Sequence, residues 1–257
     1  MRDEMYNKIQ KTLQQIEEQR DITILYAAES GTRGWGFPSK DSDYHCRFIY
    51  IHPQEFYLAV NEEKDYIELS VDSIYDIQGW DLKKVLKSIQ KSDPTVSEWL
   101  QSPVIYMEKE GFRETLLNLN AKYFDEKPAL NHYRSIAATK LEDIKNHKEQ
   151  RLKRYFYVLR SLLATDYIMA NHSMPPMTFQ ALYECAAIHQ DLCDEIEKLI
   201  ETKAGNNDWL KIPTHDALIK CFEGLLKKCD NYLQKADKSQ RQDDKALNQF
   251  FRDWIGN

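Results

Sequence analysis

Residues 29–50 read ESGTRGWGFPSKDSDYHCRFIY and decide the fold. The short apolar run at 22–28 that precedes them predicts a buried strand, and the run at 46–51 predicts a second one. Between the two strands lies a turn that holds three of the chain's eight glycines, followed by clustered acids. The front of the chain is therefore organised as strand, small-residue turn, carboxylate and strand.

This order suits a nucleoside triphosphate. Glycines such as Gly31 let the backbone approach phosphate oxygens, which accept hydrogen bonds from its amides. The Thr32 hydroxyl adds a donor, and Asp43 opens the second strand, where its carboxylate can hold a divalent metal. Two metal ions held by carboxylates can activate an attacking hydroxyl and stabilise a leaving pyrophosphate.

The stretch resembles the signature of the DNA polymerase β-type nucleotidyltransferase superfamily, in which a Gly-Ser pair is followed, after a spacer, by Asp-x-Asp or Asp-x-Glu on a strand. Here Gly31-Thr32 matches the pair and Asp43-Tyr44-His45 matches the acidic motif. The short motifs around this match resemble more narrowly the predicted nucleotidyltransferases linked to RNA repair operons. Those motifs are Glu29-Ser30-Gly31, Trp35-Gly36, Ser42-Asp43-Tyr44 and Arg47-Phe48-Ile49-Tyr50.

The resemblance implies metal-dependent transfer of a nucleoside monophosphate from an NTP to an acceptor hydroxyl, with two Mg²⁺ or Mn²⁺ ions and release of pyrophosphate. It implies an RNA or DNA end as acceptor, while the chemistry equally permits a protein hydroxyl or a small molecule. The implied roles are catalysis for Asp43, His45 and Asp76, metal binding for Asp43 and Asp76, and triphosphate binding for Gly31, Thr32 and Arg33.

One position departs from the family pattern. His45 stands where the pattern has a second acid, and an imidazole is a poorer ligand for hard Mg²⁺ than a carboxylate. Two other hypotheses therefore stand beside the enzyme: a nucleotide-binding protein with little or no turnover, and a partner-binding helical protein with a remnant nucleotidyltransferase domain. The first predicts triphosphate binding without transfer, and the second predicts no nucleotide binding.

The fold that the resemblance implies needs a third carboxylate on a neighbouring strand. Runs at 66–71 and 73–77 alternate and predict a hairpin, and a helix is expected from about Asp81, which is a suitable N-cap. Asp76 is our choice for the third acid because it precedes this helix, where the family pattern places one. Asp72 and Glu68 are the alternatives, since a turn near Asp72 resets the strand phase.

From about residue 111 the apolar spacing is helical, so we expect an α/β nucleotidyltransferase domain over 1–110 with a small mixed sheet, and an all-helical domain over 111–257. A basic and aromatic block at 151–160 resembles the helical half of the family, which implies phosphate contacts from Lys153, Arg154 and Arg160. The alternative is a solvated stripe of charge. His132-Tyr133-Arg134 is a weaker candidate for the same purpose.

Composition limits the class of protein. A net charge of −6 argues against a protein that coats nucleic acid without specificity. The five cysteines, at 46, 185, 193, 221 and 229, have neither disulfide-framework nor zinc-motif spacing, so we expect reduced thiols in a cytoplasmic protein. No apolar run approaches the length of a membrane span, and the sequence does not indicate an oligomeric state.

Overall fold

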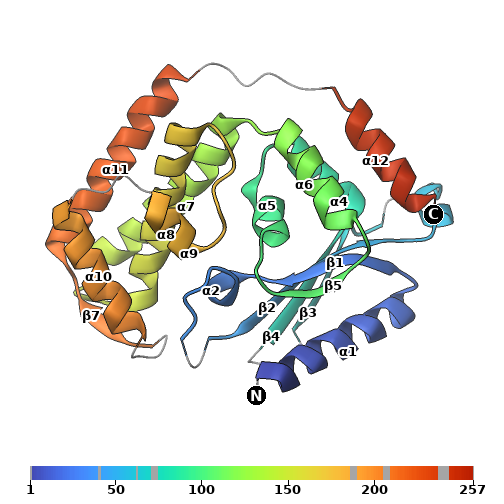
Figure 1. Cartoon of the computed structure of the whole chain (residues 1–257), viewed down its shortest axis with the longest axis horizontal. Coiled ribbons are helices and arrows are strands. Elements are labelled where there is room, and N and C mark those ends of the chain that lie inside the picture. Colours follow the sequence, from blue (N-terminus) through green and yellow to red (C-terminus); the bar gives the residue numbers. More distant parts are fainter. Residues whose placement is uncertain are drawn as a thin grey trace. The chain divides into compact units, whose positions relative to one another are not determined.

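The computed structural model describes residues 2–39, 42–61, 63–70, 75–185, 190–204, 209–236 and 243–256 (Figure 1). Contacts divide the chain into two compact units. The first contains Met1–Gly34, Asp43–Phe124 and Arg241–Asn257, and the second contains Trp35–Ser42 and Asp125–Gln240. The sequence-based boundary between residues 110 and 111 therefore falls inside the first unit.

The first unit is built on a five-stranded sheet of order β3-β4-β2-β1-β5. Its strands are β1 (Thr23–Glu29), β2 (Tyr44–Ile51), β3 (Tyr66–Ser70), β4 (Tyr75–Asp81) and β5 (Ile105–Glu108). β2 and β4 are parallel, and the other neighbouring pairs are antiparallel. The predicted α/β fold with a small mixed sheet is confirmed.

Helices cover both faces of this sheet (Figure 1). Helix α1 (Arg2–Arg20) lies along one face, because its apolar residues recur at helical spacing and are buried there with Phe48 and Tyr50 of β2. The other face is covered by α4 (Leu82–Gln90), α5 (Pro94–Leu100), α6 (Phe112–Lys122) and α12 (Lys245–Ile255). Ile49 belongs to this second core, so the alternation of β2 directs His45 and Arg47 to the same side.

Aspartate side chains cap the first turns of two helices in the first unit. Asp81 caps α4 by accepting a hydrogen bond from the Lys83 amide at 2.7 Å, as expected. Asp93 likewise caps α5 through the Thr95 amide at 2.9 Å. Two short helices, α2 (Gly31–Gly34) and α3 (Gln54–Tyr57), lie in the turns of the first unit.

The second unit is mainly helical. Its helices are α7 (Glu126–Lys145), α8 (Leu152–Asn171), α9 (Phe179–Cys185), α10 (Gln190–Ala204) and α11 (Asp216–Lys235). Helix α8 is buried along most of its length between α7, α9 and α11. A two-stranded ribbon, β6 (Glu149–Arg151) with β7 (Lys211–Pro213), adds to the helices that the sequence predicts. Strands of three residues are too short for a periodic pattern to reveal.

Trp35 and Phe37, which follow the glycine turn, pack inside the second unit. The Trp35 ring meets Tyr157 edge-on at 5.0 Å between centroids, and Phe37 stacks on Phe156 at 5.2 Å. The Phe179 amide donates to the Trp35 carbonyl at 2.8 Å. Aromatic contacts with α8 and α9 therefore anchor part of the signature stretch. Across the described ranges, no helix combines the length and apolarity that a membrane span requires.

Candidate active site

The glycine turn lies directly against strand β2. Gly31 has a φ of +61°, a conformation that glycine adopts without strain. The Ser30 amide donates to the His45 carbonyl at 2.8 Å, which joins the turn to the start of β2. A Cβ on Gly31 would lie 2.7 Å from Cδ2 of His45, so no side chain fits between them. Glycine is therefore needed at position 31 for both its backbone conformation and its contact with His45.

His45, Asp76 and Arg47 form a connected polar network beside this turn. Parallel pairing of β2 with β4 sets His45 opposite Asp76, and the ring Nδ1 lies 2.5 Å from Oδ1 of Asp76. The other carboxylate oxygen accepts a hydrogen bond from Nη2 of Arg47 at 3.0 Å. Both oxygens of Asp76 are thus occupied by side chains of β2.

The balance of these contacts keeps Asp76 ionised. Burial raises the pKa of Asp76, but the hydrogen bond and charge of Arg47, together with the hydrogen bond from His45, outweigh that effect and hold the pKa below its usual range. The Asp76 side chain is 41% exposed and that of His45 is 35% exposed. The network is therefore partly accessible to solvent and to a ligand.

Glu29 supports the network from the end of β1. It is 1% exposed, and it accepts hydrogen bonds from the His45 amide at 2.7 Å and from the Tyr106 hydroxyl. Burial raises the pKa of Glu29, against the opposing effect of these hydrogen bonds. The Ser102 hydroxyl donates to the Glu29 carbonyl at 2.6 Å. Glu29 therefore fixes the backbone that carries His45.

Asp43, Thr32 and Arg33 complete the group in the first unit. Asp43 immediately precedes β2 and is exposed. Nε of Arg33 donates to the Asp43 carbonyl at 3.2 Å, and its guanidinium lies 3.8 Å over the ring of Tyr44. Thr32 is buried in α2. The six residues predicted from the signature and the third-acid argument, Gly31, Thr32, Arg33, Asp43, His45 and Asp76, thus gather around the end of β1 and the starts of β2 and β4.

The sheet register bears on the choice of third carboxylate. Asp76 pairs with His45, whereas Glu68 pairs with Gln78, two positions further along β4. Asp72 lies outside the described residues. The register therefore favours Asp76 as the acid beside the signature. Sequence reasoning missed Glu29 and Arg47 as site residues, although the two-residue period of β2 puts Arg47 on the same side as His45.

Asp43 and Asp76 differ in how available their carboxylates are to a Mg²⁺ ion. Within the described ranges there is no group of three or more His, Cys, Asp or Glu side chains arranged to hold a metal. Asp76 is committed to His45 and Arg47, and the guanidinium puts a fixed positive charge beside it. Asp43 offers an exposed carboxylate, and Mg²⁺ commonly binds through one or two carboxylates together with substrate phosphates.

The basic residues predicted on the helical half lie in the second unit, on α8. Arg154 donates to Oε1 of Gln150 at 3.0 Å, and Lys153 is partly exposed. Arg160 is 3% exposed, donates to the Met177 carbonyl at 2.9 Å, and lies 4.4 Å over the ring of Trp35. Arg160 therefore has structural contacts inside this unit.

The weaker candidates are also in the second unit. Nε of Arg134 donates to Oδ1 of Asp230 at 2.8 Å, which ties α7 to α11. The His132 ring packs edge-on against Tyr133, which is buried in the helical core. The first contact joins two helices, and the second lies within α7.

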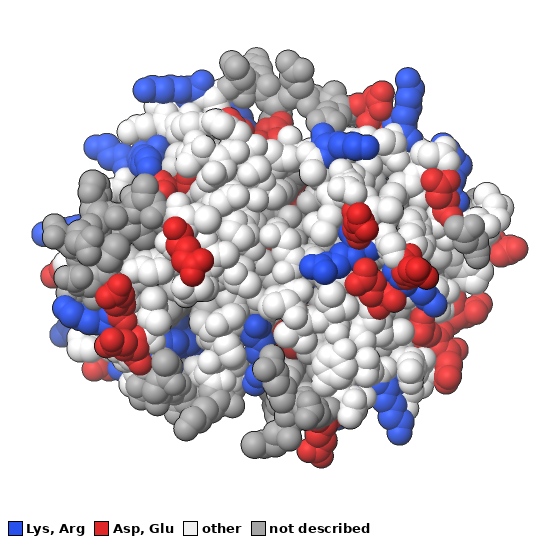
Figure 2. Space-filling view, in the orientation of Figure 1, with Lys and Arg blue, Asp and Glu red and all other residues white. Residues whose placement is uncertain are grey.

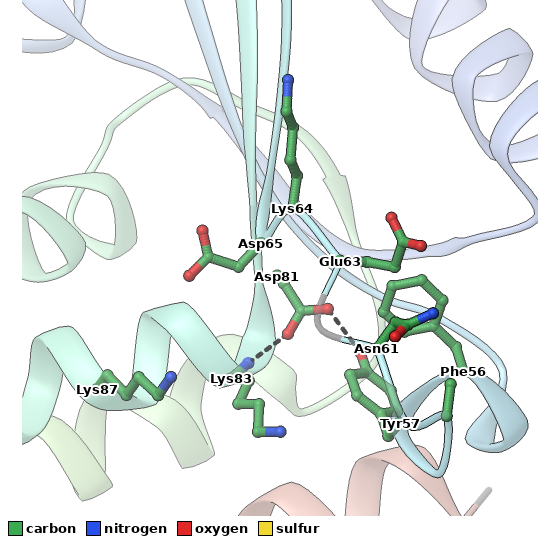
Figure 3. A pocket seen from close by; sticks show the side chains of 10 residues that line it. Phe56, Tyr57, Asn61, Glu63, Lys64, Asp65, Asp81, Lys83 and Lys87 are labelled. Carbon is green, nitrogen blue, oxygen red and sulfur yellow. Dashed lines mark hydrogen bonds between the residues drawn. The ribbon is translucent and has the colours of Figure 1, made fainter.

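A pocket of about 140 Å³ lies at the other end of β4 (Figure 3). Asp81 lines it, but its oxygens accept from the Lys83 amide and from the Tyr57 hydroxyl, both at 2.7 Å. Pockets that bury a drug-sized ligand usually exceed about 300 Å³. Asp76 and Asp81 are also separated by five residues of strand, or roughly 17 Å. This pocket is thus separate from the group around His45.

Comparison with known proteins shows the family of the chain. The sequence model described as the RNA repair pathway DNA polymerase beta family matches residues 5–253. The uncharacterized protein YcgL of Bacillus subtilis (strain 168) is 39% identical over 199 residues, which cover 77% of this chain and 76% of that protein.

A solved structure, the nucleotidyltransferase-like protein from Exiguobacterium sibiricum 255-15, aligns with a TM-score of 0.28 and 10% identity over 88% of this chain and 74% of that one. A similarity this low supports no inference about function. The family match, in contrast, spans nearly all of the sequence, from residue 5 to residue 253. The chain therefore belongs to the RNA repair pathway DNA polymerase beta family.

Proposed function

We propose that this member of a nucleotidyltransferase family transfers a nucleoside monophosphate from an NTP to the hydroxyl of an RNA or DNA end and releases pyrophosphate. The observation that carries the proposal is the contact between the glycine turn and the His45–Asp76–Arg47 network. A phosphate-binding turn and a carboxylate must lie within one ligand's length of each other for this chemistry. A Cβ built on Gly31 would lie 2.7 Å from the His45 ring, and Nδ1 of that ring lies 2.5 Å from Oδ1 of Asp76, which supports the proposal.

The proposal assigns a separate role to each residue of this group. Gly31 keeps the turn open to the triphosphate, and the Arg33 guanidinium supplies a charge that is attractive to its phosphates. Asp43 is the proposed ligand of a Mg²⁺ ion, which supplies charge stabilisation to the triphosphate and the leaving pyrophosphate when bound. Asp76 orients His45, and Glu29 holds the backbone on which His45 sits. Catalysis of this kind depends mainly on positioning and electrostatics.

A second candidate function is nucleotide binding without turnover, which the replacement of the second acid by His45 favours. One substitution distinguishes a damaged enzyme from a chain in which His45 has another role. If the chain is a damaged enzyme, His45→Asp should increase transfer strongly. If His45 serves a different purpose, the substitution should leave transfer unchanged or lower it.

The test is incubation of the full-length protein with each radiolabelled NTP in Mg²⁺ or Mn²⁺, with RNA, DNA and the protein itself as acceptors. We expect Asp43→Asn to lower transfer by more than about a hundredfold, since a bound metal is worth several kcal/mol in the transition state. Glu18→Gln is the control, because Glu18 is an exposed acid on α1 that the proposal gives no role. Nucleotide binding without transfer to any acceptor would contradict the enzymatic proposal and support the second candidate.

A further inference from the structure

The ribbon β6–β7 presents an aromatic ring at the surface of the second unit. Trp209, just before β7, is 62% exposed. The guanidinium of Arg151, the last residue of β6, lies 3.9 Å over its ring. Tryptophan is seldom this exposed in a folded chain, because leaving its large apolar surface in water forgoes the stabilisation of burial. The exposed ring therefore suggests a surface that is used for contact.

The backbone around this ring is well supported. The Leu152 amide donates to the Leu210 carbonyl at 2.8 Å, and the Thr214 amide donates to the Lys148 carbonyl at 3.0 Å. Gln150, in the middle of β6, is buried and donates to the Asp143 carbonyl at 2.8 Å. The ribbon is thus anchored to the end of α7, and the side chains beside Trp209 stand on a fixed support.

The charges on the ribbon work against its own stability. The register sets Arg151 directly opposite Lys211, and like charges at facing positions of an antiparallel pair destabilise it. Glu149, the acid of β6, pairs with Pro213 at the other end of the ribbon. The stack on Trp209 accounts for Arg151, whereas Lys211 adds a second cation directly opposite it. An anionic ligand would remove the repulsion.

The chain adds further positive charge immediately afterwards. Lys153 and Arg154 occupy the first turn of α8, which contains no acidic residue. The helix dipole makes cations unfavourable there. Departures from local rules are expected at functional sites. We call the set Arg151, Lys153, Arg154, Trp209 and Lys211 the basic platform.

We propose that the basic platform binds single-stranded nucleic acid, with a base stacked on Trp209 and the backbone phosphates bound by the cations. A single strand offers both an open base face and a row of phosphates, whereas a duplex hides its base faces. This inference rests on the proposed function in that the bound strand is the acceptor. It goes further by assigning the strand contact to residues of β6, β7 and α8.

The distribution of charge agrees with local recognition. Figure 2 shows basic and acidic side chains interspersed on the face of the molecule that it presents. The chain as a whole carries a net charge of −6. Binding of a polyanion therefore depends on a restricted group of cations together with stacking, rather than on a broad positive field.

The test uses the full-length protein and fluorescein-labelled 12-nucleotide single strands of RNA and DNA, with binding followed by fluorescence anisotropy over a range of salt. Trp209→Ala should weaken binding about ten- to a hundredfold, which is the range for loss of one stacked base, whereas Trp209→Phe should retain most of it. Lys211→Ala should weaken binding and lower the slope of log K against log salt by about 0.7. Lys11→Ala, at an exposed lysine of α1, is the matched control and should bind like the wild type.

Each outcome separates this inference from the proposed function. If Asp43→Asn loses transfer and still binds the strands, both proposals are supported. If no transfer occurs and Trp209→Ala still weakens binding, the platform stands and the proposed function fails. If the wild type labels RNA and Trp209→Ala does so with an unchanged KM, or if the wild type binds neither strand, the platform is overturned. Weakened binding of NTP alone in Trp209→Ala would overturn it as well.

Discussion

Replacing Gly31 with Ala should destabilise the front of the sheet through two separate effects. The backbone is held at a φ of +61°, where a residue with a Cβ is disfavoured by about 1–2 kcal/mol. The new Cβ would also lie 2.7 Å from Cδ2 of His45. Carbon atoms prefer a separation of about 3.5–4.0 Å, so the ring must move by roughly 1 Å.

That movement stretches the 2.5 Å contact between His45 and Asp76. A hydrogen bond to a charged group contributes roughly 1.5–3 kcal/mol, and partial exposure of both groups reduces this to about 1 kcal/mol here. The expected total for Gly31→Ala is therefore about 2–3 kcal/mol. Transfer activity should fall with it, because the turn and the polar network are displaced together.

Gly111→Ala is the matched control. Gly111 has a φ of +74°, but no atom lies within 4 Å of a Cβ built on it, so only the backbone effect applies. Hydrogen exchange of peptides from β2, measured by mass spectrometry under native conditions, reports the local free energy of opening. In a His45→Ala background, Gly31→Ala should cost no more than Gly111→Ala does. An equal cost for the two glycine substitutions in the wild-type background would refute the reasoning.

Three other substitutions test the surrounding contacts. Arg47→Met should raise the pKa of Asp76, measured by carboxyl NMR, because burial then acts with less opposition. A carboxyl group whose pKa is lowered by folding stabilises the fold at pH values above its unfolded-state pKa, which is about 3.9. The variant should therefore be less stable than the wild type at pH 6, and the difference should vanish at lower pH. For Glu29 the effect of pH on stability has the opposite sign, because burial raises the pKa of its carboxyl group. Its contribution to folding stability is fully present below about pH 4.3 and is lost as the pH rises through the folded-state pKa. Glu29→Gln should accordingly gain Tm relative to the wild type between pH 4 and pH 8, and parallel pH profiles would contradict this. Gly79→Ala places a Cβ 2.2 Å from the buried ring of Phe48 and should cost about 3 kcal/mol in urea denaturation, whereas an unchanged midpoint would exclude the clash.

The elements that follow simple periodicity could be predicted from the sequence. The strand expected at 46–51 is the core of β2, and the helix expected over 153–170 is α8 within two residues. These patterns depend on neighbours three or four residues apart in a helix, or two apart in a strand, so a single sequence contains the necessary information.

Pairings between distant segments could not be predicted in the same way. The amphipathic pattern of 245–255 predicts a helix but not the core that it joins. In the structure Trp254 packs edge-on against Phe112, at 4.8 Å between ring centroids. Trp35 and Phe37 read as part of the signature, yet their rings pack on α8 and α9. An apolar face indicates burial and leaves the partner open, which is why the boundary at residue 110 differs from the division by contacts.

Part of the candidate site could be predicted from the sequence. Asp43 and Gly31 follow from the motif, and Asp76 follows from its place before α4. The role of Arg47 depends on the register that sets His45 against Asp76, which the pairing of distant strands β2 and β4 determines. The support from Glu29 depends on a hydrogen bond across β1 and β2. Neither is a property of local sequence.

The return of α12 to the first unit has a consequence for synthesis on the ribosome. Phe250 and Trp254 of α12 pack against Phe112, and Phe251 packs against Tyr57. Residues 125–240 of the second unit are translated between these partners. Domains often fold in order as they emerge, but here the core that flanks the candidate active site stays incomplete until the helical unit has been made. The apolar patch around Phe112 and Tyr57 that α12 covers is thus exposed through nearly half of translation, which makes the nascent chain a natural client for a chaperone that binds apolar segments.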